Sequence, residues 1–504
     1  MTKSVNKIVI LLVALLMCLT VVFAACSKDN FTPVKIPAKG EVGSNGGIAV
    51  TYGDYLYYVN GYTADVSAEN TYSDDVKDNP RIGSVVRIKL AEIETLIAIY
   101  NDDDLTSSKK TENIAAAVRG GTIDGVVYEG AETVIPKIYY SGNTTATQFT
   151  GIYIFNDRIY VTTPSDELTP NGDPMTDQLK LMSFNLGGGD RKEHFTFTNN
   201  AAQIWLDVVD GKLVATYLMD NVLHVLDVAN GKKGDKVVTK DYSSKLKHIN
   251  NTVSGVNWDK QGKAVFFIDE FGSLCKLAFG ATEYEVIVEN DTYKSHGDHI
   301  ESGKTSYTIK FVNDGVVYYT KATGANSATD NIVLYRADGT NKDVSVLPTN
   351  SVSATAWKDN KLIITKSIPS GNKTFYGIWA IEVVEKDGVK TYVEEEVILP
   401  GENDSNITIN KIEGDVLYYT VDSVSYTVNI ADAIAANGVD QGSARAKSLA
   451  STTGWAEPDL VKVGSIYYVI SLKNDSVTLT TFDPENIKGD VATVALTLTP
   501  VPAE

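Results

Sequence analysis

Cysteine is nearly absent from this 504-residue chain, which contains Cys18, Cys26 and Cys275. The first two lie in or at the end of an apolar leading segment, so Cys275 is the thiol left for the folded part. That part therefore has no internal disulfide to rely on. In residues 273–277 (SLCKL), Cys275 alternates with charged and apolar neighbours. This pattern predicts a buried structural thiol on a strand rather than a nucleophile.

Positive charge is also in short supply, with 45 Lys and Arg against 64 Asp and Glu and a formal net charge of -19. A field of that sign repels phosphate backbones, so we exclude nucleic acid as a partner. Proline is scarce at 14 residues, whereas Tyr reaches 27 and Gly 39. This balance favours strands joined by turns over helices.

A short pattern recurs along the chain, and residues 411–419 (KIEGDVLYY) show it most clearly: an apolar residue, a Gly-Asp turn and a strand ending in two tyrosines. The spacing between copies is about fifty residues, which is typical of an array of one small unit that buries its apolar face against its neighbours. The other copies are at residues 52–58, 155–161, 209–215, 258–267, 312–319, 357–364 and 463–468.

Each unit resolves into four strands with tight turns between them. The second unit predicts strands at 151–155, 158–162, 178–185 and 194–198, and the fourth predicts strands at 255–258, 264–268, 273–279 and 284–288. Four antiparallel strands repeated about an axis predict an all-β fold, a β-propeller of four-stranded blades. The repeats favour eight blades, with seven as the alternative if one copy is a stray hairpin.

We expect the propeller to span residues 47–499. Its first unit predicts third and fourth strands at 84–90 and 95–100. An insertion at 101–148 follows, with a short helical piece near 112–118.

Residues 1–25 read as an export signal, because Lys3 and Lys7 precede an apolar run from 8 to 23. The sequence Phe23-Ala-Ala-Cys26 resembles the lipobox of bacterial lipoproteins, although Phe stands where Leu is usual. The resemblance implies cleavage after Ala25 and attachment of a diacylglyceryl group to Cys26. Ordinary secretion with an incidental cysteine is the alternative.

The lipid would determine where the protein is located in the cell. Two acyl chains anchor a protein stably, whereas one does so only marginally. Residues 26–46, which include Pro33, Pro37 and several Gly and Ser, predict a flexible tether. The propeller is therefore expected on the outer side of the cytoplasmic membrane, facing the extracellular space.

Two segments carry a resemblance to a known family. Residues 414–419 (GDVLYY), and the polar third strand in residues 331–339 (NIVLYRADG), look like bacterial lipoprotein propellers related to the low-density-lipoprotein-receptor type of propeller domain. The Tyr-Trp-Thr-Asp signature of the receptor type is absent, and residues 419–422 (YTVD) are only an echo of it. The resemblance implies the fold and not an activity.

Three groups of residues are candidates for binding. His296 and His299, close to Glu301, could hold zinc or contact a ligand, against the simpler interpretation of a solvated loop. Asp102, Asp103 and Asp104 offer the hard oxygen ligands that calcium prefers, without EF-hand spacing. Trp455, in a connection between two units, could stack on a sugar ring or a partner, with covering the edge of the core as the alternative. We otherwise expect no cofactor.

The predicted loops are unequal on the two faces of the disc. Asp, Asn and Gly pairs close short turns on one face, and the long connections, such as 61–80 and 101–148, gather on the other. We therefore expect a noncatalytic binding protein, not an enzyme, whose long-loop face takes an extracellular protein, peptide or glycan. The alternatives are a carbohydrate-active hydrolase or lyase with carboxylates at the central channel, and a structural assembly component.

Overall fold

In the computed structural model, the described residues run from 48 to 499 with gaps, of which the longest are 62–82, 139–150, 165–177, 239–252, 324–333, 450–458 and 483–491. Strands dominate, and eight four-stranded sheets are present in this part of the chain. In each sheet the strands pair antiparallel and follow one another in chain order. In the first sheet, β4 and β5 are skipped, because they form a separate two-stranded sheet. We number these sheets blades 1–8.

The first four blades are built from sixteen strands. In chain order these are β1 (Ala49–Tyr52), β2 (Tyr55–Val59), β3 (Val85–Lys89) and β6 (Glu132–Ile135) in blade 1; β7 (Tyr153–Phe155), β8 (Arg158–Pro164), β9 (Gln178–Asn185) and β10 (Lys192–Thr198) in blade 2; β11 (Gln203–Val209), β12 (Lys212–Met219), β13 (Val222–Asp227) and β14 (Asp235–Val237) in blade 3; and β15 (Ser254–Asp259), β16 (Ala264–Ile268), β17 (Leu274–Ala278) and β18 (Glu285–Val288) in blade 4.

Blades 5–8 repeat the plan. Their strands are β21 (Thr305–Asn313), β22 (Val316–Thr323), β23 (Leu334–Ala337) and β24 (Val344–Leu347) in blade 5; β25 (Ser351–Ala356), β26 (Leu362–Ser370), β27 (Lys373–Lys386) and β28 (Val389–Glu402) in blade 6; β29 (Thr408–Glu413), β30 (Val416–Val421), β31 (Val424–Asn429) and β32 (Lys447–Leu449) in blade 7; and β33 (Asp459–Val463), β34 (Ile466–Lys473), β35 (Ser476–Phe482) and β36 (Thr493–Ala495) in blade 8.

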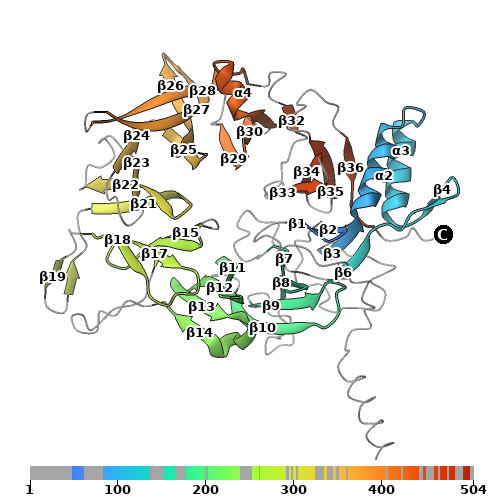
Figure 1. The fold of residues 1–504 in the computed structure, drawn as a ribbon, viewed down its shortest axis with the longest axis horizontal. Coiled ribbons are helices and arrows are strands. Elements are labelled where there is room, and N and C mark those ends of the chain that lie inside the picture. The colour runs from blue at the N-terminus through green and yellow to red at the C-terminus, as the bar shows by residue number, and fades with distance from the viewer. Residues whose placement is uncertain are drawn as a thin grey trace, which may run out of the picture.

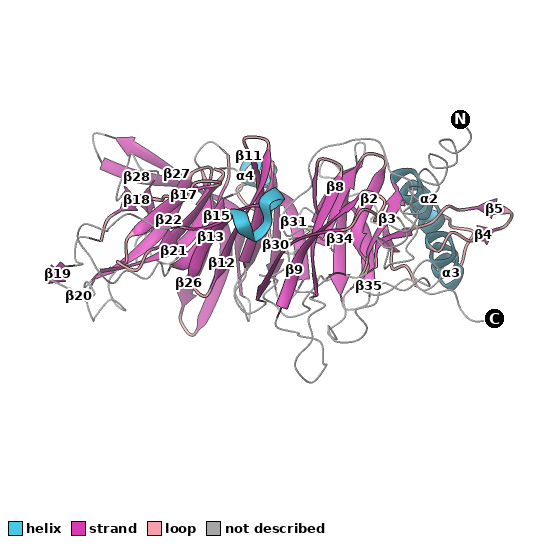
Figure 2. Cartoon of the chain, turned by 90° about the horizontal axis from the view of Figure 1, so that it is seen from below, coloured by secondary structure: helices cyan, strands magenta, loops and turns pink. Residues whose placement is uncertain are grey.

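The blades form a ring in which the first strand of each lies nearest the middle (Figure 1). Seen from the side, the strands run between the two faces of a disc (Figure 2). The second strands β2 and β16 are buried along their whole length because they are packed on both sides by neighbouring blades. The predicted β-propeller is confirmed.

The predicted turns are also confirmed. Asn156 and Asp157 both have positive φ between the paired residues Phe155 and Arg158 of β7 and β8. Asp314 and Gly315 repeat this geometry between β21 and β22. Asn, Asp and Gly tolerate positive φ, which explains why they occupy two-residue hairpin turns. The predicted strands of the second and fourth units agree with the observed strands to within two residues at each end.

One predicted strand is wrong. Residues 95–100 lie in helix α2 (Leu90–Asn101), which is followed by α3 (Ser107–Val118) and the hairpin of β4 (Thr122–Ile123) and β5 (Val126–Val127) before β6 completes blade 1. The helical piece predicted near 112–118 is confirmed within α3. Both helices pack against β36 at the outer edge of blade 8, where α2 buries Ile93 and Leu96 (Figure 1). This packing overrides the strand preference of the local sequence.

The remaining described helices are α4 (Ile430–Ala435) and the 3-10 segment η3 (Val228–Gly234). Among the helices that the structure describes, no helix has both the length and the apolar character needed to cross a membrane.

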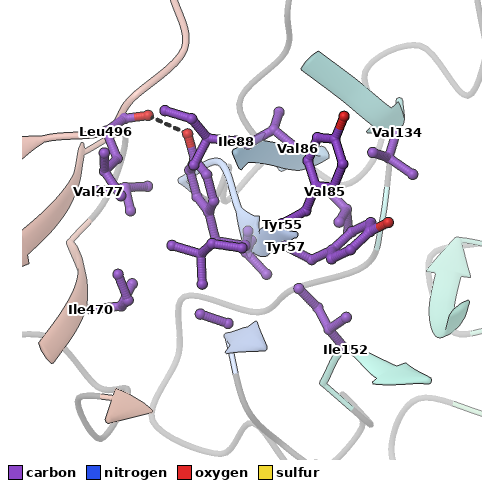
Figure 3. Packing of buried hydrophobic residues seen from close by; sticks show 14 of the residues in the cluster. Tyr55, Tyr57, Val85, Val86, Ile88, Val134, Ile152, Ile470, Val477 and Leu496 are labelled. Carbon is purple, nitrogen blue, oxygen red and sulfur yellow. Dashed lines mark hydrogen bonds between the residues drawn. The ribbon is translucent and has the colours of Figure 1, made fainter. Parts of the chain in front are cut away.

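The first and last blades share one core. Val85 and Val86 of blade 1, Ile152 beside blade 2, and Ile470 and Val477 of blade 8 belong to a single buried cluster (Figure 3). Polar groups reinforce this seam. The buried hydroxyl of Tyr58 donates to the carbonyl oxygen of Leu496 at 2.7 Å, and Asn60 bonds to the backbone of Leu498 in both directions. Residues from opposite ends of the sequence therefore hold the ring closed.

Candidate functional site

Several predicted site residues lie outside the described part of the chain, namely Ala25, Cys26 and Trp455. Cleavage after Ala25, lipid on Cys26 and stacking by Trp455 therefore stay predictions. The same is true of a ligand-binding face formed by the long loops, because residues 62–82 and 139–150 are likewise not described.

The His296 and His299 segment differs from the loop expected there. It forms a small hairpin of β19 (Lys294–His296) and β20 (His299–Glu301), in which His296 and His299 are directly paired. The hairpin projects from the edge of the ring beyond blade 4 (Figure 1). The side chains of His296 and His299 lie outside the described part of the structure, so their contact with zinc or a ligand stays a prediction.

Asp102, Asp103 and Asp104 are all exposed at the end of α2. Asp102 Oδ1 accepts a hydrogen bond from the backbone N–H of Asp104 at 3.0 Å, as in a simple turn. Among the residues with a described position, no group of three or more His, Cys, Asp or Glu could hold a metal ion. Calcium at these aspartates stays a prediction.

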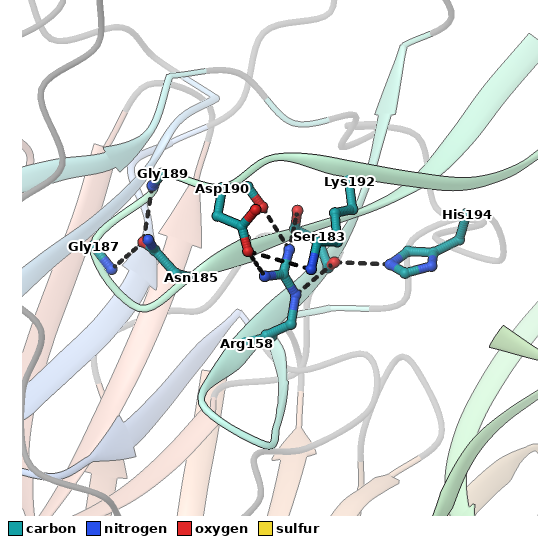
Figure 4. A network of polar contacts seen from close by, with 8 residues as sticks. All are labelled: Arg158, Ser183, Asn185, Gly187, Gly189, Asp190, Lys192 and His194. Atoms are coloured by element: carbon teal, nitrogen blue, oxygen red, sulfur yellow. Dashed lines mark hydrogen bonds and ion pairs between the residues drawn. The ribbon is translucent and has the colours of Figure 1, made fainter. Parts of the chain in front are cut away.

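A polar network in blade 2 gathers charged and polar groups around His194 (Figure 4). Arg158 donates from Nε to Ser183 Oγ at 3.0 Å and pairs with Asp190. Ser183 Oγ lies 2.7 Å from His194 Nε2, and His194 Nδ1 lies 3.2 Å from the carbonyl oxygen of Val228 in blade 3. The carbonyl accepts, so Nδ1 carries the proton, and the Ser183 hydroxyl donates to Nε2.

The protonation of this network follows from its surroundings. Burial lowers the pKa of His194, and the positive charges of Arg158 and Lys192 lower it further, against the opposing effect of its hydrogen bond to Val228. Burial alone would raise the pKa of Asp190, but hydrogen bonds from Arg158 hold it below its ordinary value. Ser183 is fully buried, and its hydroxyl contacts Arg158 and His194 inside the protein. We interpret the network as a tie between blades 2 and 3, despite its Ser-His pair.

Blade 3 contains a different arrangement, in which buried polar atoms have no partner. Trp205 Nε1, Asp207 Oδ2 and Thr216 Oγ1 are each buried without a hydrogen bond among the described residues. Trp205 and Asp207 are two positions apart on β11 and so face the same side, and Trp205 is paired directly with Thr216 on β12. One donor, one carboxylate oxygen and one hydroxyl thus share one face of the blade.

This face looks toward blade 4. Trp205 packs in the core that joins blades 3 and 4, whereas its neighbours Ile204 and Leu206 pack toward blade 2. Asp207 is half-buried as a residue, but its Oδ2 atom is closed off from solvent. Its other oxygen, Oδ1, accepts from the backbone N–H of Val208 at 2.7 Å.

Three aromatic rings lie beside these polar atoms. The ring centroids of Trp205 and Trp258 are 6.0 Å apart with planes 7° from parallel, and Phe279 stacks on each of them at 6.1 and 6.2 Å. Both tryptophans are half-buried and so keep part of their surface open. Nearly parallel rings of this kind offer a flat apolar platform next to the Asp207 carboxylate.

The charge of Asp207 reaches across the blade. Burial raises the pKa of Tyr153, on the first strand of blade 2, and the negative charge of Asp207 raises it further. Asp207 forms no ion pair with any described Lys, Arg or His. Asp207 thus has no direct ion pair among the described residues, while Lys212 lies on the same face of the neighbouring strand β12.

Sequence reasoning missed Asp207, Trp205 and Thr216. Their association depends on the register between β11 and β12 and on the stacking of blade 4 against blade 3, neither of which is a local property. One local signal did exist: Asp207 interrupts an otherwise apolar stretch at residues 204–209 (IWLDVV). An acid in the middle of such a strand needs a partner or a function.

No protein family matches the sequence, and no curated protein does either. Solved structures with a similar fold include an oligogalacturonate lyase in complex with manganese, at 12% identity and a TM-score of 0.36, covering 66% of this chain and 88% of that one. An oligogalacturonate lyase from Vibrio parahaemolyticus has 12% identity and a TM-score of 0.35, with 67% and 86% covered. A dihydro-heme d1 dehydrogenase, NirN, has 9% identity and a TM-score of 0.35, with 68% and 71% covered.

These findings correct the expectation of a noncatalytic binding protein that is not an enzyme, because the similar structures include oligogalacturonate lyases, in line with the alternative. The relation to lipoprotein and receptor-type propellers stays a prediction. At such low identity and TM-score, no substrate, metal or residue role transfers to this chain. The manganese of one neighbour finds no matching ligand cluster in the described residues.

Proposed function

We propose that the protein is a carbohydrate-active enzyme, a hydrolase or lyase, with the Asp207 carboxylate on the innermost strand of blade 3 as its base. The observation that carries this proposal is the buried, unpartnered Oδ2 of Asp207. An unsatisfied carboxylate oxygen costs folding energy, and such groups in native proteins are often explained by a functional role or by an external donor. A sugar hydroxyl or a reacting water is a donor of the right kind.

The surroundings of Asp207 support a carbohydrate as the substrate. The apolar faces of sugar rings pack on aromatic surfaces, and Trp205 and Trp258 present such a surface beside the carboxylate. Sugar hydroxyls both donate and accept. They could therefore bond to Asp207 Oδ2 and to the free indole N–H of Trp205 at the same time.

Both reactions need a base. In hydrolysis the base takes a proton from the water whose oxygen bonds to the anomeric carbon, while the glycosidic bond breaks and the leaving oxygen takes up a proton from solvent. In elimination the base takes the proton from the carbon next to the sugar carboxylate, a double bond forms to the adjacent carbon, and the bond from that carbon to the linkage oxygen breaks as this oxygen takes up a proton from solvent. General bases contribute about 10²–10⁴-fold to such rates.

The experiment is a screen of the purified protein against polysaccharides, in which new reducing ends report any cleavage and absorbance of unsaturated products reports elimination. We expect Asp207→Asn to lower cleavage at least about 100-fold. The matched control is Asp220→Asn in the turn between β12 and β13, where Asp220 has positive φ that Asn tolerates equally well. Unchanged activity of Asp207→Asn, or no cleavage of any polysaccharide, would overturn the proposal.

We also propose that the enzyme is held on the outer side of the membrane by lipid on Cys26, as the sequence 23–26 (FAAC) supports. Mass spectrometry of the mature N-terminus tests this. A diacylglyceryl cysteine is expected, and a Cys26→Ser variant should be released from the membrane. A mature chain without lipid on Cys26 would contradict the anchor.

A further inference from the structure

A small hairpin outside the propeller blades carries two histidines opposite each other. Its strands, β19 and β20, form a two-stranded sheet that joins none of the eight four-stranded sheets. The hairpin lies in the connection from blade 4 to blade 5 and projects from the edge of the ring (Figure 1). It is therefore on the periphery of the disc, whereas Asp207 is on the innermost strand of blade 3.

The backbone register assigns the residues of the hairpin to its two faces, although their side chains lie outside the described part of the structure. His296 is paired directly with His299, and Glu301 is two positions beyond His299 on the same strand. Directly paired residues share a face, and alternate residues of one strand do so too. Both histidines and Glu301 therefore belong to one face, and Ser295 belongs to the other.

The spacing of the two histidines matches that of zinc ligands on a helix. Directly paired residues of an antiparallel ladder have Cβ atoms about 4.5–5.5 Å apart. In the His-Glu-x-x-His zinc motif the two histidines are four positions apart on a helix, where Cβ atoms are about 5–6 Å apart. The cross-strand pair of this hairpin can therefore chelate one ion as that helical pair does.

We infer that the hairpin binds one zinc ion through His296, His299 and Glu301. Two imidazoles and one carboxylate are a common ligand set of zinc, and they leave a fourth position for water. Imidazole nitrogen suits zinc and not calcium, which takes about six to eight oxygen ligands. This site is separate from Asp207 and does not depend on the proposed enzymatic role.

The size of the hairpin gives the ion a structural role. Each strand has three residues, and a lone two-stranded hairpin is at best marginally stable in water. An ion bound to both strands cross-links them, so its binding energy contributes to the folding of the hairpin. Lys294 is paired with Glu301 and would compete for its carboxylate, but surface ion pairs are weak.

The test is a zinc titration of the purified full chain, prepared without a polyhistidine tag and freed of metal by a chelator. Calorimetry should show one ion per chain, and calcium should not compete with it. His296→Gln and His299→Gln should each weaken binding at least about 100-fold, because removal of even a supporting group at a metal site costs about 10–100-fold. Ser295→Ala, on the opposite face of the same hairpin, is the matched control and should change the affinity less than about threefold.

Hydrogen exchange locates the ion independently of these substitutions, because the backbone amides of β19 and β20 should gain protection when zinc binds. Absence of stoichiometric zinc, or unchanged affinity in the variant with both histidines replaced, would overturn the inference. An equal loss of affinity in Ser295→Ala would do the same. Unchanged affinity in Glu301→Gln would overturn the set of three ligands.

Discussion

The side chain of Asn60 and the backbone of Leu498 share two hydrogen bonds, although 438 positions separate them in the sequence. Asn60 Nδ2 donates to the Leu498 carbonyl oxygen at 2.9 Å, and Oδ1 accepts from the Leu498 N–H at 2.8 Å. Asn60 is fully buried. These two hydrogen bonds connect blades 1 and 8, as the hydrogen bonds between neighbouring strands connect the strands within one blade.

Replacing Asn60 by Ala should therefore destabilise the whole ring. Both backbone groups of Leu498 would be left buried and unpaired, at a cost of about 2–5 kcal/mol in the free energy of unfolding. Denaturant unfolding measures this cost. The exposed Asn101 at the end of α2 provides the control, since Asn101→Ala should change stability by less than about 0.5 kcal/mol. Equal stability of the two variants would contradict closure through Asn60.

We expect the buried, unpartnered hydroxyl of Thr216 to lower the free energy of unfolding of the protein without ligand. Thr216→Val removes a buried hydroxyl that has no described partner and keeps the shape of the side chain, so the free energy of unfolding should rise by about 1–3 kcal/mol. Thr365 is the matched control, because it is equally buried but accepts from the Ser353 N–H at 3.0 Å. Thr365→Val should destabilise by about 1–3 kcal/mol. A loss of stability in Thr216→Val would show that its hydroxyl is already satisfied.

Stability should depend on pH through His194. Burial holds its pKa in the folded protein below the ordinary value of 6.5, so the unfolded chain takes up a proton first as the pH falls. The stability contributed by neutral His194 is therefore complete above pH 6.5 and is lost as the pH falls toward the folded pKa. Arg158 and Lys192 add repulsion to the protonated form.

The measurement is the melting temperature between about pH 7.5 and 5.5, a range that lies above the ordinary carboxylate pKa values. His194→Gln lacks the titrating imidazole and should show a weaker dependence than the unmodified chain. Parallel curves for the two proteins would mean that another group is responsible.

The indole N–H of Trp205 should contribute to ligand binding and not to folding. Trp205→Phe keeps an aromatic ring and removes the donor, so we expect about 5–30-fold weaker binding of an oligosaccharide from the polysaccharide that is cleaved, and little loss of stability. Trp357 is the control because its Nε1 donates to the carbonyl oxygen of Gly414 at 3.2 Å. Trp357→Phe should leave binding unchanged; a similar loss of affinity in both variants would remove the special role of Trp205.

Features that depend on the residue types of a short segment, such as the hairpin turns, could be predicted from the sequence. The turns Asn156-Asp157 and Asp314-Gly315 could be placed because their residue types tolerate the positive φ that they adopt. Four of the six residues 95–100 (TLIAIY) are β-branched or aromatic, and the segment was mistaken for a strand because its packing partner, β36, lies about 400 positions away. The candidate site was missed for the same physical reason. It exists only where β11, β12 and blade 4 are brought together.

The most direct test of the account is a crystal structure of the protein with the oligosaccharide that it binds or cleaves. We expect a sugar ring against Trp205 and Trp258, with a hydroxyl within hydrogen-bond distance of Asp207 Oδ2 and an oxygen accepting from Trp205 Nε1. A sugar bound on the opposite face of the disc, with Asp207 Oδ2 and Trp205 Nε1 still unpaired or bonded to the protein alone, would contradict it.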